Sequence, residues 1–166
     1  MLDEEMQQAL NDQINAELAS GYLYLSMATY FEDEDLPGFA NSLRVHAEEE
    51  LEHGMKIYDY IIRKNGSVKL QAIEEPRRQW DGIVDVYESI LEHEEFVTSL
   101  INDLVDLSIK LSDHATNQFL QWFVEEQVEE EELAHEDLRK VKMAVDSKHL
   151  LFELDQQYGS LTNNDE

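Results

Sequence analysis

The segment at residues 124–136, VEEQVEEEELAHE, carries six glutamates among the eight residues from Glu125 to Glu132. Like charges three or four residues apart destabilise a helix, so the simplest interpretation is an acidic face turned toward solvent. At ~100° per residue, however, Gln127 and Glu130 fall on the same arc as the apolar residues of this segment. One glutamate of the run is therefore predicted to point into the protein interior.

A carboxylate interrupts the apolar stripe of three other segments in the same way, at Glu17, Glu50 and Glu94. Burying four unpaired carboxylates would cost several kcal/mol each or force them to take up protons. A pair of divalent cations removes this difficulty, and oxygen ligands with one imidazole suit Fe²⁺ or Mn²⁺. Glu50 and His53 stand at i, i+3, so both side chains can reach one ion. Such a pair alone is common by chance, and the prediction of a di-metal centre rests on the whole set.

Four long segments with helical periodicity must position these residues, and they lie at about 3–33, 38–65, 81–111 and 113–145. Gly66 is predicted to cap the second helix. The link of about 15 residues that follows is just long enough to run back along that helix, so the second and third helices can lie parallel. The pattern predicts an all-α four-helix bundle with one long crossover. A short fifth helix at about 147–158 completes a single domain over residues 1–166.

Composition narrows the classes of partner. The chain has 38 acidic residues against 12 Lys and Arg, a formal charge of -26, which disfavours nucleic acid and anionic membranes and favours cations. A general acidic adaptation of the surface, for solubility or high salt, is a second interpretation that composition alone does not separate from the first. It contains no cysteine, which excludes thiolate metal sites and cysteine nucleophiles. It has no apolar run of membrane-spanning length, and its start, MLDEEMQQ, lacks the pattern of a signal peptide. A soluble cytoplasmic protein is therefore expected.

The remaining histidines and one tyrosine differ in their predicted roles. His46, one turn before Glu50, is interpreted as a core histidine beside the ligands. Tyr24 shares a stripe with Glu17, and two interpretations stay open for it, simple core packing or electron donation to a metal. The other histidines lie off the stripes or near helix ends and are predicted to be at the surface: His93, His114, His135 and His149.

Several blocks of the sequence resemble bacterial and archaeal non-haem ferritins. They are NAELASGYLYLSMATYFE, RVHAEEELEHGMKIYDYI, LEHEEF and NQFLQWFVEEQVEEEE, and the resemblance covers essentially the whole chain. It implies a ferritin-like fold in which Glu17, Glu50 and His53 hold one iron. The second iron would be held by Glu50, Glu94 and Glu130, with Gln127 beside it. It further implies a weaker third iron site formed by Glu49, Glu126 and Glu129, with Glu130 shared. It also implies two aromatic residues that donate electrons, Tyr24 and Trp122.

Two positions separate this chain from related families. Bacterioferritin and rubrerythrin carry a second Glu-x-x-His on the fourth helix, where this chain has Gln127-x-x-Glu130. The second iron therefore lacks an imidazole, which fits iron that passes through. Bacterioferritin places a haem-ligating Met at the position of Leu51, so no haem is expected.

The resemblance implies an iron-storage ferritin with ferroxidase activity. It would oxidise Fe²⁺ to Fe³⁺ with O₂ at a di-iron centre within each subunit. The ferric oxide mineral would be stored inside a shell of 24 identical subunits. Two other functions stay open at this point: a metal-buffering cage that does not catalyse oxidation, and a small oligomeric di-iron enzyme that consumes H₂O₂.

Overall fold

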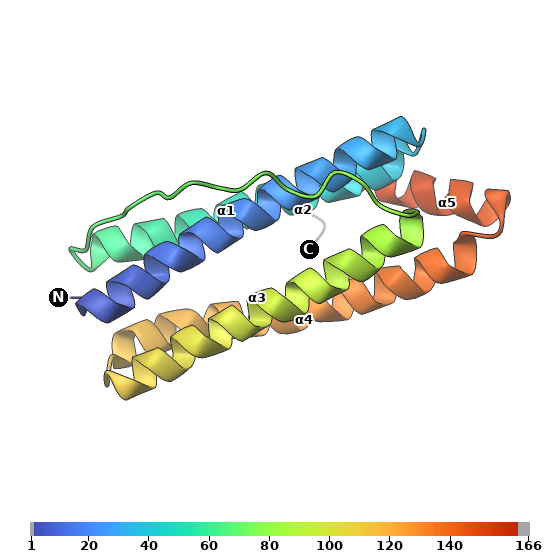
Figure 1. The fold of residues 1–166 in the computed structure, drawn as a ribbon. Helices are drawn as coiled ribbons and strands as arrows, with labels where there is room; N and C mark the ends of the chain where they lie inside the picture. Colours follow the sequence, from blue (N-terminus) through green and yellow to red (C-terminus); the bar gives the residue numbers. More distant parts are fainter. Residues whose placement is uncertain (1, 163–166) are drawn as a thin grey trace.

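The computed structural model describes residues 2–162, which form five helices and no strand. The helices are α1 (Glu4–Asp33), α2 (Pro37–Arg63), α3 (Ile83–Lys110), α4 (His114–Ala144) and α5 (Lys148–Gly159). In Figure 1, α1 pairs with α2 and α3 pairs with α4, while the long link after α2 runs back along the α1–α2 pair. The predicted all-α bundle with one long crossover and a short fifth helix is confirmed. Within residues 2–162, no helix is both long and apolar enough to cross a membrane.

Tight turns end the first three helices, and each uses a residue in the left-handed region. Asp35, Asn65 and Ser112 have φ between 54° and 56°. The amide of the residue after each one donates back to the carbonyl five residues earlier, as Gly66 N–H does to Ile61 O at 2.9 Å. The predicted cap at Gly66 is therefore wrong by one residue, because Asn65 takes the left-handed position. A Cβ on Gly66 would lie 2.9 Å from Ile61 Cγ2, so close packing explains this glycine.

The core consists of two apolar clusters separated by a polar layer. One cluster lies toward the α5 end of the bundle and includes Phe31 and Phe39. The other lies toward the opposite end and includes Leu10, Ile57 and Leu120. On every long helix, the buried acid predicted from the sequence falls between the residues of the two clusters. The apolar clusters thus fix the four helices in register, which brings their polar residues to one level.

Helix α5 is held at the end of the bundle by buried polar contacts. The Asp155 carboxylate accepts the backbone N–H of Gly38 at 2.8 Å and of Phe39 at 3.1 Å. It thereby caps α2, whose own N-cap residue makes no side-chain hydrogen bond. A Cβ on Gly38 would lie 1.7 Å from the Asp155 carbonyl oxygen, so only glycine fits. Tyr158 adds a hydrogen bond to Asp137 at 2.7 Å.

Candidate metal centre

Six polar side chains from all four long helices meet in the layer between the apolar clusters. Each is at most 7% exposed, which confirms that they point inward as predicted. Glu125, their neighbour on α4, is exposed, so the acidic run does have one inward-facing side and one outward-facing side. The six are Glu17 on α1, Glu50 and His53 on α2, Glu94 on α3, and Gln127 and Glu130 on α4.

Glu17, Glu50 and His53 form a compact group, which we call the inner cluster. One potential ligand atom from each residue lies within 4.8 Å of the others. His53 Nδ1 is 3.5 Å from Glu50 Oε2 and 4.0 Å from Glu17 Oε2. Gln13 donates to the other Glu17 oxygen at 2.8 Å, which fixes the orientation of that carboxyl. These are the residues predicted to hold the first iron.

Burial raises the pKa of both carboxyls in the inner cluster, which makes them weaker acids. Burial and the charge of Glu94 raise the pKa of Glu50 to about 8. Burial and the neighbouring Glu50 also raise the pKa of Glu17 well above its usual range. At neutral pH the Glu50 carboxyl therefore keeps a proton until a cation replaces it. Two buried carboxyls and a buried imidazole are a ligand set for a divalent cation.

His53 also belongs to a second group, with Glu126 and Glu130, which we call the outer cluster. Its ligand atoms again lie within 4.8 Å of one another. The two ring nitrogens face opposite sides, because Nδ1 faces the inner cluster while Nε2 lies 3.6 Å from Glu126 Oε1. A neutral imidazole has one lone pair and one N–H. If Nδ1 binds an ion, Nε2–H can donate to Glu126 and hold the ring in place.

The ligand set predicted for the second iron does not form such a compact group. It consists of Glu50, Glu94 and Glu130. Glu94 belongs to neither cluster. Its carboxylate accepts a hydrogen bond from the Tyr24 hydroxyl, and its other oxygen lies 3.2 Å from Gln127 Nε2. Gln127 thus lies beside Glu94, on the face expected for the second iron.

The three acids predicted for a third iron site are spread from the interior to the surface. Glu126 is partly buried and enters the outer cluster. Glu49 is also partly buried, and Glu129 is exposed, and neither belongs to a cluster. An open pocket of about 500 Å³ between α2 and α4 reaches His53 and Glu126 from the surface. Their joint role as a site stays a prediction.

Comparison with known proteins places this arrangement in a family. Residues 7–144 match the ferritin-like domain family. The chain is 41% identical over 159 residues to the bacterial non-heme ferritin of Bacteroides fragilis, an alignment that covers 96% of this chain and 99% of that protein. The chain belongs to the ferritin family. The bacterial non-heme ferritin of Campylobacter jejuni is 37% identical over 94% of this chain and 93% of its own length.

Solved structures agree with this assignment. The open pore ferritin of the hyperthermophilic archaeon Archaeoglobus fulgidus superposes on this ferritin with a TM-score of 0.96 at 44% identity. The match covers 98% of this chain and 100% of the archaeal one. The bundle, the crossover and α5 are therefore all shared with the archaeal ferritin.

Two histidines of this ferritin flank Tyr24, and one of them was predicted wrongly. Tyr24 is fully buried, and the His46 ring meets it edge-on at 5.9 Å between centroids. His93 also packs against Tyr24, at 5.8 Å, and its Nε2 lies 2.7 Å from Ser20 Oγ. His93 lies off the central seam as expected, but it is partly buried and not at the surface, because it packs against α1 from the flank of α3. Burial lowers the pKa of His93.

Proposed function

We propose that this ferritin is a ferroxidase that stores iron. The observation that carries the proposal is the buried inner cluster of Glu17, Glu50 and His53, whose carboxyls are stable in that position only when protonated or when bound to a cation. Relatives of matching length are named bacterial non-heme ferritins. Iron is here the substrate and the cargo of the protein. Each subunit would be one ferritin-like domain over residues 1–166, without haem.

In the proposed reaction, two Fe²⁺ ions each give up one electron to the same O₂ molecule, which takes up two protons and becomes H₂O₂. Holding both ions in one rigid layer makes the two-electron step possible, which is a proximity effect. Glu17, Glu50 and His53 would hold one ion, while Glu50, Glu94 and Glu130 would hold the other. Glu50 would release its proton as the ions bind, because its oxygens are needed as ligands.

Residues around Glu94 would orient it toward the second ion. Tyr24 donates to one of its oxygens, and Gln127 Nε2 lies near the other. Because Gln127-x-x-Glu130 supplies no imidazole, the second position would hold Fe³⁺ less firmly and release it toward the interior of the shell. If Tyr24 and Trp122 also supplied one electron each, O₂ would take up four electrons and four protons and give two water molecules in place of H₂O₂. The Trp122 ring meets His53 at 5.4 Å between centroids.

Released iron would pass the acidic pocket between α2 and α4 on its way to the mineral. Glu49, Glu126 and Glu129 would form the third iron site, with Glu130 shared. A net charge of -26 per chain would concentrate cations at acidic surfaces. The mineral would then grow inside a shell of 24 subunits in the cytoplasm.

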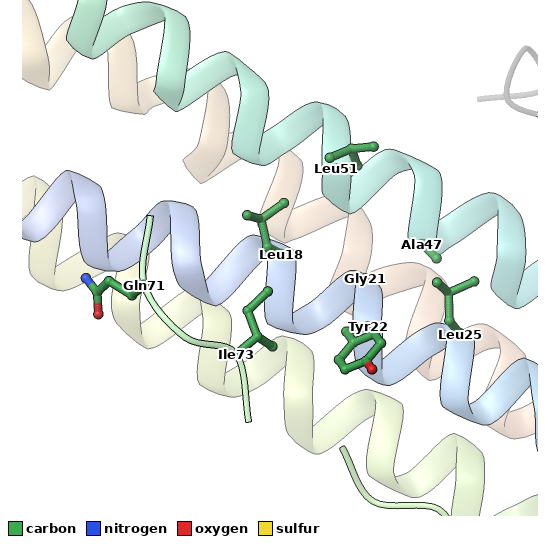
Figure 2. Close-up of a pocket in the computed structure, with 8 residues that line it drawn as sticks. All are labelled: Leu18, Gly21, Tyr22, Leu25, Ala47, Leu51, Gln71 and Ile73. Atoms are coloured by element: carbon green, nitrogen blue, oxygen red, sulfur yellow. The ribbon is translucent and has the colours of Figure 1, made fainter. Parts of the chain in front are cut away.

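An exposed apolar groove supports assembly into such a shell. The groove has a volume of about 500 Å³ and lies over α1 and α2, beside the long crossover (Figure 2). Tyr22, Leu25 and Leu51 along it are each 47–51% exposed in the single chain. A continuous apolar patch of this kind usually marks a surface that a partner covers. In the proposed shell, a second copy of the chain covers it.

The test is the rate of Fe²⁺ oxidation by O₂, measured by stopped-flow absorbance. Glu50→Ala removes a carboxylate from the inner cluster, and we expect the rate to fall by about tenfold or more. Glu125→Ala is the matched control, since it removes an exposed glutamate and should leave the rate unchanged. An unchanged rate in Glu50→Ala would contradict catalysis and favour a buffering cage.

Storage requires a separate measurement, by size-exclusion chromatography followed by iron loading. We expect a large shell that takes up far more iron than its ferroxidase sites can bind. A dimer that holds only two irons per chain and prefers H₂O₂ to O₂ would instead indicate a peroxide-consuming enzyme.

A further inference from the structure

The open pocket between α2 and α4 contains one lysine among four carboxylates. It is lined by Glu49, Glu52, His53, Met55, Lys56, Asp59, Trp122 and Glu126. The pocket ends at the His53–Glu126 side of the outer cluster. Lys56 therefore places a permanent positive charge along the path that a cation would take to that cluster.

The Lys56 ammonium is not held by the nearest acids. Glu52 and Asp59 stand at i-4 and i+3 from Lys56, which are the usual spacings of helical ion pairs. In the described part of the chain, Lys56 Nζ lies instead 3.7 Å from the centroid of the Trp122 ring. An exposed cation–π contact of this kind stabilises by only about 0.5–1 kcal/mol, so the ammonium is easily displaced.

Two ring contacts limit the distance between this ammonium and the outer cluster. Lys56 comes three residues after His53 on α2, and Trp122 comes four residues before Glu126 on α4. Both pairs span about one helical turn, or about 4.5–6 Å along the axis. The Trp122 ring also meets His53 edge-on at 5.4 Å between centroids. The ammonium lies 3.7 Å from the Trp122 centroid, so its distance from the His53 ring centroid is at most about 9 Å, the sum of the two separations.

We propose that Lys56 is a tethered competing cation, which occupies the pocket when the outer cluster is empty and is driven off the Trp122 ring when a divalent cation binds there. This inference rests on the proposed function, because it takes Fe²⁺ as the cation in the cell. Lys56 would weaken binding at the outer cluster and so help iron to move onward. Its effect on the inner cluster would be smaller, because Glu17 and the Nδ1 side of His53 lie farther from the pocket.

The size of the effect follows from Coulomb's law. A single charge about 6–9 Å from a divalent ion, in water because the pocket is open, changes affinity by about five- to tenfold at low salt. At 0.15 M salt the screening length is about 8 Å, and the change falls to about twofold. This loss with salt distinguishes a charge effect from a change in packing.

The experiment uses Zn²⁺ as a divalent probe that does not undergo oxidation, with the assembled protein and three variants. Lys56→Met removes the charge and keeps an apolar stem, while Lys56→Arg restores a cation at the same place. Lys110→Gln makes the same change in net charge at a distant exposed site, where Lys110 pairs with Glu5. Calorimetry at low salt and at 0.15 M gives the affinities. Crystals soaked in graded Zn²⁺ give the occupancy of each cluster from the anomalous signal.

We expect Lys56→Met to fill the outer cluster at five- to tenfold lower Zn²⁺ than the native protein at low salt, with Lys56→Arg and Lys110→Gln close to native. The native crystals should show the ammonium away from Trp122 when the outer cluster is full. Equal outer occupancy in native and Lys56→Met would overturn the inference and leave the proposed function standing, and so would a lysine that stays on the ring. An absence of Zn²⁺ from both clusters would overturn both.

Discussion

The raised pKa of Glu50 makes a quantitative prediction about proton release. With a pKa of about 8, this carboxyl is about 0.9 protonated at pH 7 and about 0.1 protonated at pH 9. An ordinary glutamate would be ionised at both pH values. A metal ion can bind only to the ionised form, so each inner cluster that fills at pH 7 must release about 0.9 proton from Glu50, in addition to any from Glu17. At pH 9 the contribution of Glu50 should nearly disappear.

The assay is a Zn²⁺ titration by calorimetry in two buffers of different ionisation enthalpy, which gives the number of protons released per bound ion. Ions that bind to exposed acids release no protons in this range, because those acids are already ionised. Glu50→Gln should lose about one proton per ion at pH 7, and Glu125→Gln should match the native chain. Proton release that is absent at pH 7, or that stays constant up to pH 9, would refute the argument that burial holds this carboxyl protonated.

Three further substitutions test the docking of α5, the packing beside the polar layer and the hydrogen bond to Glu94. Gly38→Ala should detach α5, because the new Cβ would lie 1.7 Å from a backbone oxygen of α5. Limited proteolysis should then cut that helix. The control is Gly159→Ala, whose Cβ would meet its nearest neighbour at 3.5 Å, and this variant should remain resistant to proteolysis. Gly54→Ala should stabilise the protein by about 1 kcal/mol and raise its melting temperature by about 2–4 °C, because a Cβ there meets only ordinary contacts from 3.5 Å; a lower melting temperature would show that the layer cannot accept a methyl group. Tyr24→Phe removes the hydrogen bond to Glu94 and should slow Fe²⁺ oxidation by about tenfold in stopped-flow measurements, whereas a native rate would show that Glu94 needs no such support.

The helices and the buried layer could be predicted from the sequence because both follow from periodicity. A stripe that repeats every 3.6 residues shows which side of a helix is buried, and an acid on that stripe must be buried with it. The same reasoning failed for His93, which faces α1 from the flank of α3. A single stripe describes one contact surface, whereas a helix in a bundle contacts two neighbours. The left-handed residue at Asn65 was missed for a related reason, since the glycine beside it is required by Ile61 and not by its own backbone.

The sequence predicts less well which ligand residues come together, because this depends on how each side chain is rotated and not only on which face of the helix it occupies. The sequence places Glu94 on the inward face, but its carboxylate turns to Tyr24 and Gln127. The sequence also gives no sign that His53 faces acids on both sides. Each of these choices depends on which hydrogen-bond partner a neighbouring helix supplies, and that is known only when the helices are placed together.

Burial of the acids also links the stability of the protein to its ligand. A carboxyl whose pKa is raised from 4.5 to about 8 contributes stability that is present below the lower value and is lost as the pH rises through the upper one. The chain without metal should therefore be least stable at alkaline pH. A bound cation reverses this dependence, because it takes the place of the proton and binds more tightly as the carboxyls ionise. The apolar clusters on both sides of the layer stabilise the fold with or without a bound cation, so the helices can stay in place while a cation binds and leaves.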